Sequence, residues 1–172
     1  KKFYDVNSKK YINVPSSENH YILDAFRENK QILRNPECTV HDIGDGVMCI
    51  EFQTKGNSIG EGIAKGINEA IDIAERDGWN GIVIGNNDKQ FSVGANLMNM
   101  GMMAMQKNFD EIEKFLVGFQ KILMRMRTCN VPVVSATHGF VMGGGLEVSI
   151  HCDAGIHASE SYIGLVEAGV GL

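Results

Sequence analysis

The chain has 172 residues, of which 44% are hydrophobic and 22% charged, and its formal net charge is −5. This composition is typical of a globular protein with one domain, and not of a disordered protein. No run of 18 apolar residues occurs, so we expect no membrane span, and no secretory signal is recognisable. The acidic balance argues against a nucleic-acid partner, which would require a basic face.

The cysteines and histidines show no metal-ligand spacing. Cys38, Cys49, Cys129 and Cys152 lie far apart in the sequence and form no CxxC motif. We therefore expect reduced thiols in a cytoplasmic protein, and no metal.

Residues 1–38 differ in composition from the rest of the chain. They are rich in Lys, Asn, Tyr and Ser, and Pro15 and Pro36 interrupt regular secondary structure. We expect a linker-like arm from an upstream domain, containing a short helix over residues 18–34. The remaining residues, 39–172, form the core domain in this prediction.

The first part of the core reads as a hairpin followed by a helix. Residues 39–43 and 47–52 flank a Gly-Asp-Gly turn, which is a hairpin signal. Ser58 and Glu61 have the spacing of a capping box, and apolar residues then recur at helical spacing until Gly78, which we expect to end the helix.

Strands and helices alternate through the second part. Residues 81–84 form a wholly apolar strand, typical of a parallel sheet covered on both sides. We expect a helix over 109–127 and strands at 131–137 and near 154–157, which indicates an α/β fold. The methionine-rich run 98–105 is consistent either with a wall of an apolar pocket or with a core helix.

The segment from Met142 to Glu147 contains three consecutive glycines between an apolar strand and a helix-compatible stretch. A strand–turn–helix order leaves backbone N–H groups unpaired at the helix start, where the helix dipole is positive. Such a turn can stabilise an oxyanion, and it can equally be a tight turn where two backbones approach. A second glutamate, Glu167, follows twenty residues after Glu147.

Four blocks, in their order and spacing, resemble the crotonase (enoyl-CoA hydratase/isomerase) superfamily. The resemblance runs from about Val40 to Leu172 and is nearest to the hydratase part of bacterial proteins that fuse a 3-hydroxyacyl-CoA dehydrogenase to a crotonase domain. The blocks are FSVGANL at 91–97, HGFVMGGGLE at 138–147, CD at 152–153 and YIGLVE at 162–167.

The resemblance implies an oxyanion hole made of backbone N–H groups at Ala95 and Gly144, which would hold the thioester oxygen. Four further positions are implied to contact the substrate: Gly94, Asn96, Leu97 and Gly143. Asn96 departs from the aspartate that is more usual in the family. Because the donor is backbone, this change affects loop hydrogen bonding more than chemistry.

The resemblance also implies that Glu147 and Glu167 are the catalytic pair of a hydratase. Hydration needs one group that takes a proton from water and one that supplies a proton to the α-carbon. We assign the first role to Glu147 and the second to Glu167. The alternatives are an enoyl-CoA isomerase, which can work with one glutamate, and a non-catalytic crotonase scaffold for assembly or RNA binding.

The implied fold is a crotonase-like ββα superhelix, truncated here so that its C-terminal helices are missing from this fragment. The implied function is reversible hydration of trans-2-enoyl-CoA in fatty-acid β-oxidation, within a larger, bifunctional protein. Hydration requires no cofactor, since CoA is part of the substrate, whereas NAD would serve the missing dehydrogenase part. A homo-oligomer is expected at full length.

Overall fold

The computed structural model describes residues 2–14, 21–26 and 30–171. Its main element is a mixed six-stranded sheet in the order β3-β4-β5-β6-β7-β9. The pairs β3–β4 and β4–β5 are antiparallel, and β5–β6, β6–β7 and β7–β9 are parallel. The strands are β3 (Gln31–Arg34), β4 (Cys38–Gly44), β5 (Val47–Phe52), β6 (Gly81–Ile84), β7 (Val133–Thr137) and β9 (Ala154–His157).

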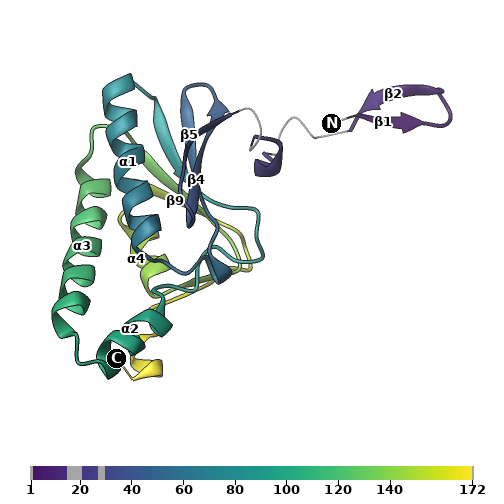
Figure 1. Cartoon of the computed structure of the whole chain (residues 1–172). Helices are drawn as coiled ribbons and strands as arrows, with labels where there is room; N and C mark the ends of the chain where they lie inside the picture. Colours follow the sequence, from purple (N-terminus) through teal and green to yellow (C-terminus); the bar gives the residue numbers. More distant parts are fainter. Residues whose placement is uncertain (1, 15–20, 27–29, 172) are drawn as a thin grey trace.

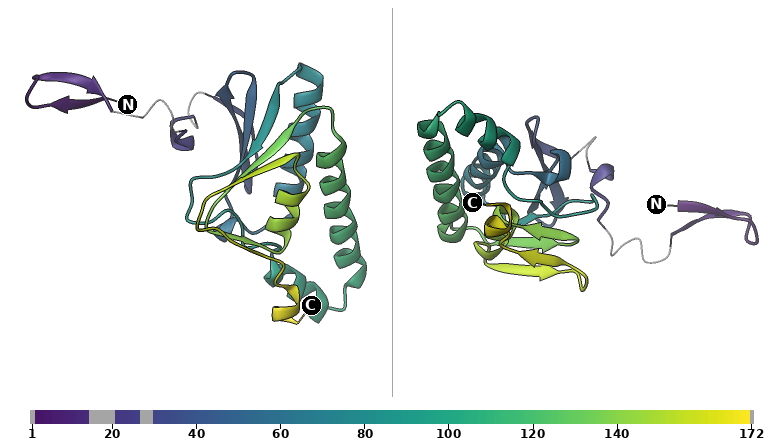
Figure 2. Two further views of the ribbon diagram at one scale, coloured as in Figure 1. Left: turned by 180° about the vertical axis from the view of Figure 1, so that it is seen from behind. Right: turned by 90° about the horizontal axis from the view of Figure 1, so that it is seen from below.

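Two long helices cover one face of this sheet, α1 (Glu61–Asp77) and α3 (Phe109–Thr128). They lie side by side in Figure 1 and in the reverse view of Figure 2. The buried face of α1 is an apolar stripe that packs on the sheet. Both helices and the strand β6 agree with the predicted elements, and Gly78 ends α1 in the left-handed conformation, with φ of +72°.

The start of α1 is fixed by tertiary contacts. The predicted capping box at Ser58 is wrong. The helix begins at Glu61, its N-cap residue is Gly60, and no side-chain hydrogen bond is made from this N-cap. The carboxylate of Glu37, just before β4, instead accepts a hydrogen bond from the N–H of Ile63 at 3.1 Å. Sequence spacing could not show this because the capping residue comes from another element.

The arm differs from its prediction. The prediction of helix over residues 31–34 is wrong, because this segment is the strand β3, which pairs with β4. Leu23–Ala25 forms a 3-10 turn (η2), and the expected helix also covers residues 18–20 and 27–29, which lie outside the described part of the chain. Nearer the N-terminus, β1 (Lys2–Asp5) and β2 (Lys10–Asn13) form an antiparallel hairpin. The boundary at residue 38 stays a prediction.

A second, two-stranded sheet positions the glycine turn. It joins β8 (Phe140–Met142) in parallel to β10 (Tyr162–Gly164), and the helix α4 (Gly144–Ile150) follows β8 directly. The segment that contains Ser92 runs beside β8, because Ser92 N–H donates to Phe140 O and Met142 N–H donates to Ser92 O, each at 3.0 Å. Three segments far apart in the sequence therefore meet at the start of α4.

Two further elements close this region. The methionine-rich run is the helix α2 (Leu97–Met105), and the chain passes after β10 into the 3-10 helix η4 (Glu167–Val170). Figures 1 and 2 show the C-terminal end of the chain beside α2. The interpretation of the run as a core helix is wrong, since none of its side chains is fully buried.

Candidate active site

Two unpaired backbone N–H groups lie close together at the start of α4. Within the described residues, neither Ala95 N–H nor Gly144 N–H donates to a protein acceptor. A β-carbon placed on Gly144 would lie 3.5 Å from Ala95 N, so the two residues are neighbours. Gly144 is the first residue of α4, where an N–H has no partner within its own helix. Both N–H groups can donate a hydrogen bond to a single oxygen atom, which accepts the two bonds with its lone pairs.

Gly94 is required for this approach. Its φ is +92°, a region that side chains rarely allow. A β-carbon there would lie 2.8 Å from Met142 O and 3.2 Å from Gly144 N. Only glycine therefore lets the loop that carries Ala95 lie against the glycine turn. On its other side, Ile59 N–H donates to Gly94 O at 2.8 Å and fixes the loop.

The two predicted carboxylates border the same site from different elements. Glu147 lies one turn into α4, and Glu167 begins η4. Gly143, with φ of +49°, lies between them: a β-carbon on it would lie 2.7 Å from Glu167 Oε1. The hydrogen bond from Gly143 N–H to Gly164 O, at 2.9 Å, ties the glycine turn to the strand that leads to Glu167.

Burial raises the pKa of the Glu147 carboxyl above its ordinary value, and the negative charge of Glu167 raises it further. His151 opposes this by lowering the pKa. The His151 ring is held one turn further along α4, where Nδ1 lies 2.7 Å from Glu147 O. Since a carbonyl oxygen only accepts, Nδ1 carries the proton in this contact. Burial and the charge of Glu167 together therefore favour the protonated form of Glu147.

A cavity of about 420 Å³ lies beside the glycine turn. Of the predicted site residues, both glutamates line it, and so do Ala95, Gly144 and three of the four expected substrate contacts. Those three contacts are Gly94, Leu97 and Gly143. The rest of its wall is apolar and consists of Val93, Met100, Phe115, Leu116, Phe119, Leu165 and Val166.

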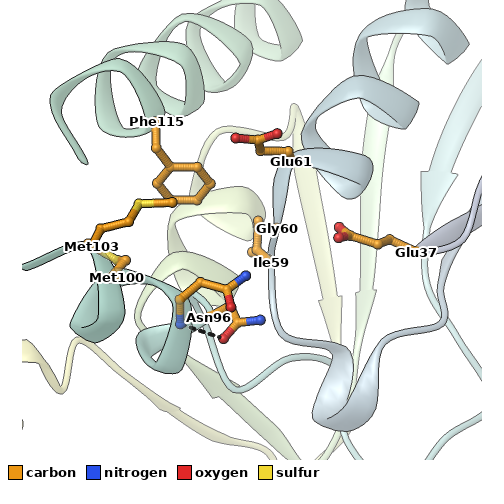
Figure 3. Close-up of a pocket in the computed structure, with 9 residues that line it drawn as sticks. Glu37, Ile59, Gly60, Glu61, Asn96, Met100, Met103 and Phe115 are labelled. Carbon is orange, nitrogen blue, oxygen red and sulfur yellow. Dashed lines mark hydrogen bonds between the residues drawn. The ribbon is translucent and has the colours of Figure 1, made fainter. Parts of the chain in front are cut away.

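Asn96 lies elsewhere. Its side chain caps α2, accepting a hydrogen bond from Asn99 N–H at 3.3 Å, and it lines a separate small chamber (Figure 3). Its own N–H donates to Ile59 O at 3.1 Å. Asn96 therefore holds the loop after Ala95 in place.

Sequence reasoning missed the apolar wall. Phe115 and Phe119 fall within the helix expected over residues 109–127, and Leu165 and Val166 fall within the YIGLVE block, but no place in a cavity wall was predicted for any of the four. The methionine-rich run was a usable signal, because Met100 lines the cavity. In the described part of the chain, no group of three or more His, Cys, Asp or Glu side chains is arranged to hold a metal ion. Among its helices, none has the length and apolar character needed to cross a membrane.

The chain belongs to the enoyl-CoA hydratase/isomerase family, whose family model matches residues 42–172. It is 37% identical over 163 residues to a Bacillus subtilis (strain 168) protein named "Probable 3-hydroxyacyl-CoA dehydrogenase", a match that covers 94% of this chain and 20% of that protein. It is 34% identical over 91 residues to a "Short-chain-enoyl-CoA hydratase" of Clostridium acetobutylicum, covering 53% of this chain and 33% of that protein. The predicted resemblance is confirmed.

Solved structures show the same fold. An enoyl-CoA hydratase from Polaromonas sp. JS666 matches with a TM-score of 0.74 at 22% identity, over 78% of this chain and 53% of that one. One from Thermoplasma volcanium GSS1 matches with a TM-score of 0.69 at 24% identity, over 80% and 54%. The predicted crotonase-like α/β fold is confirmed. The chain spans about half the length of these structures and a third or less of the two relatives above.

Proposed function

We propose that the protein catalyses the reversible hydration of a trans-2-enoyl-CoA to a 3-hydroxyacyl-CoA. One observation carries the proposal: one largely apolar cavity is lined by two carboxylates and by two backbone N–H groups that have no acceptor among the described residues. Family membership and relatives named as enoyl-CoA hydratases and as a 3-hydroxyacyl-CoA dehydrogenase support it.

The backbone donors act on the thioester oxygen. Hydration places negative charge on this oxygen as the α,β double bond is attacked. N–H groups at Ala95 and Gly144 stabilise that charge, an effect worth about 3–4 kcal/mol per donor in comparable oxyanion holes. Both donors are rigidly held, one by the loop around Gly94 and one by α4, so no reorganisation is needed as the charge develops.

The carboxylates move the protons. Glu147 takes a proton from water, whose oxygen then bonds to the β-carbon, and Glu167 supplies a proton to the α-carbon. A raised pKa makes the ionised Glu147 a stronger base than an ordinary glutamate. After hydration Glu147 carries the proton taken from water and Glu167 is ionised, and the reverse reaction begins from that arrangement.

Isomerisation of an enoyl-CoA is the second candidate. One carboxylate is sufficient to shuttle a proton between two carbons, and the family includes isomerases in its description. The presence of both Glu147 and Glu167 in the cavity favours hydration. The same pair disfavours a non-catalytic scaffold, and the net charge of −5 disfavours RNA binding.

The wider setting is part of the proposal. Longer relatives suggest that hydration serves fatty-acid β-oxidation beside a 3-hydroxyacyl-CoA dehydrogenase, with NAD as the cofactor of that second activity. We further propose that the protein works in the cytoplasm as a homo-oligomer.

Kinetics on three forms of the complete protein test the hydratase assignment. Wild type, Glu147→Gln and a control, Glu160→Gln, are supplied with crotonyl-CoA and, separately, with a trans-3-enoyl-CoA. Glu160 is exposed and does not line the cavity. We expect wild type and the control to hydrate crotonyl-CoA alike, and Glu147→Gln to be at least ~10²-fold slower. Efficient conversion of the 3-enoyl substrate without hydration would instead establish the isomerase.

A further inference from the structure

Ser92 is buried beside the two segments that carry the unpaired backbone donors, and its exposed fraction is 0%. The main chain of Ser92 is paired with β8 on both sides. Its N–H donates to Phe140 O, and its carbonyl oxygen accepts a hydrogen bond from Met142 N–H, each at 3.0 Å. The glycine turn that presents Gly144 N–H follows directly after Met142. The main chain of Ser92 is therefore fixed relative to one of the two donors.

The hydroxyl of Ser92 connects the second donor to the same point. Ser92 Oγ donates a hydrogen bond to Asn57 O at 2.7 Å and accepts one from Gly94 N–H at 3.1 Å. A hydroxyl has one proton to donate and lone pairs to accept with, so it makes both bonds at once. Gly94 N–H has no other acceptor among the described residues. Since Ala95 is the next residue, the hydroxyl holds the backbone directly before the second donor.

The acceptor of the Ser92 proton is itself held in place. Asn57 is buried, and its φ of +52° lies in the left-handed region, which asparagine tolerates better than most residues. Its side-chain Nδ2 donates to Gln90 O at 2.9 Å. Because Asn57 O is fixed in this way, the O–H bond of Ser92 has one direction, and a lone pair of Oγ stays turned toward Gly94 N–H.

The third glycine of the turn is required by the same serine. A β-carbon on Gly145 would lie 2.7 Å from Ser92 Cβ and 3.0 Å from Ser92 Oγ. The first of these distances is too short for two carbon atoms, so only glycine lets the first turn of α4 approach Ser92 this closely. The start of α4, where Gly144 presents its N–H, consequently rests against Ser92. One side chain thus contacts both segments that carry a donor.

We propose that Ser92 is a positioning residue, which sets the placement of the Ala95 and Gly144 N–H groups relative to each other. The proposal rests on the hydratase function proposed above. Without the hydroxyl, Gly94 N–H loses its acceptor, and Ala95 N–H is no longer held where the charged thioester oxygen needs it. A misplacement of about 1 Å is enough to slow an enzyme roughly 10²-fold. Because substrate binding uses the whole cavity wall, the loss falls on kcat and not on KM.

Kinetics on the complete protein compare wild type, Ser92→Ala and a matched control, Ser135→Ala. Ser135 is also 0% exposed, its Oγ lies 2.8 Å from Ser149 Oγ, and neither of these two serines lines the cavity. We expect Ser92→Ala to lower kcat for crotonyl-CoA about 10–10²-fold with little change in KM, and the control to keep both constants. A fall in kcat below about threefold, or an equal fall in the control, would overturn the proposal. If Ser92→Ala does not fold, Ser92→Cys replaces it, with the same criterion, because a thiol is a weak acceptor.

A spectroscopic measurement separates this role from the function on which it rests. Butyryl-CoA, isotopically labelled at its carbonyl carbon, has no double bond to hydrate, and hydrogen bonds to its thioester oxygen lower the infrared stretching frequency of the carbonyl. Wild type and Ser135→Ala should lower this frequency equally, and Ser92→Ala less. A smaller shift in Ser92→Ala alone supports the positioning role even if no form hydrates crotonyl-CoA. Equal shifts in all three forms, together with normal hydration by wild type, would reject the role of Ser92 and retain the hydratase.

Discussion

Replacing Gly144 by proline removes one of the two proposed oxyanion donors. Proline lacks the N–H, and at the first position of a helix that N–H has no structural partner. In this protein Gly144 is the first residue of α4, and no acceptor for its N–H is found among the described residues. The variant loses the bond to substrate, which is worth about 2.7–4 kcal/mol in comparable sites. The proline Cδ, which replaces the amide hydrogen, also lies on the side where the thioester oxygen would bind, so the loss can exceed that of the bond alone. We expect kcat for crotonyl-CoA hydration to fall about 10²–10³-fold.

The matched control is Gly144→Ala, which keeps the N–H. Its β-carbon would lie 3.5 Å from Ala95 N and from Ile59 Cδ1, which is ordinary van der Waals contact. We expect a smaller loss in this variant than in Gly144→Pro. Hydration is followed by the loss of ultraviolet absorbance of the conjugated thioester, and circular dichroism confirms that both variants are folded. Full activity in a folded Gly144→Pro protein would refute the role of this donor.

Three further predictions concern neighbouring contacts. Gly66→Ala should reduce the free energy of unfolding by about 1–3 kcal/mol in chemical denaturation, since its β-carbon would overlap Cys38 Sγ. Adding Cys38→Ala should recover most of the loss, and no recovery would contradict the packing. Gly143→Ala should lower kcat by about 10²-fold because its β-carbon would displace the Glu167 carboxylate, and unchanged kcat would contradict that contact. Glu147→Gln should raise the free energy of unfolding at pH 7. Because the pKa of Glu147 is raised in the folded protein, its contribution to stability is fully present only at pH values below its ordinary pKa of 4.5 and is lost as the pH rises through the folded-state pKa. Equal stabilities at pH 7 would contradict the sign.

The regular elements of the core could be predicted because local patterns determine them. The apolar stripe of α1 follows from helical periodicity, and β6 follows from a short, wholly apolar run. Gly78 marks the end of α1 because glycine is favoured in the left-handed conformation after a helix. The strand β3 could not be read in the same way. Gln31–Arg34 has no alternation of its own and is extended only because it pairs with β4.

The parts of the site that could be predicted are those where the backbone geometry requires a particular residue type, here glycine. Gly94 and Gly143 are glycines because of positive φ and close approach, and the family pattern located both. No sequence pattern of this kind identified the residues of the apolar wall. Phe115 and Leu165 reach the cavity only after α3 and the chain after β10 are folded against α2, and their spacing in the sequence carries no trace of this.

A double-mutant cycle on the two glutamates tests the central claim, that they act as one catalytic pair over a thioester held by Ala95 and Gly144. Steady-state kcat for crotonyl-CoA hydration is measured for wild type, Glu147→Gln, Glu167→Gln and the double variant of the complete protein. We predict that each single variant is at least ~10²-fold slower than wild type and that the double variant is no slower than the slower single one, because groups that act together are not additive. Losses that multiply in the double variant, or a single variant with near wild-type kcat, would contradict the paired mechanism.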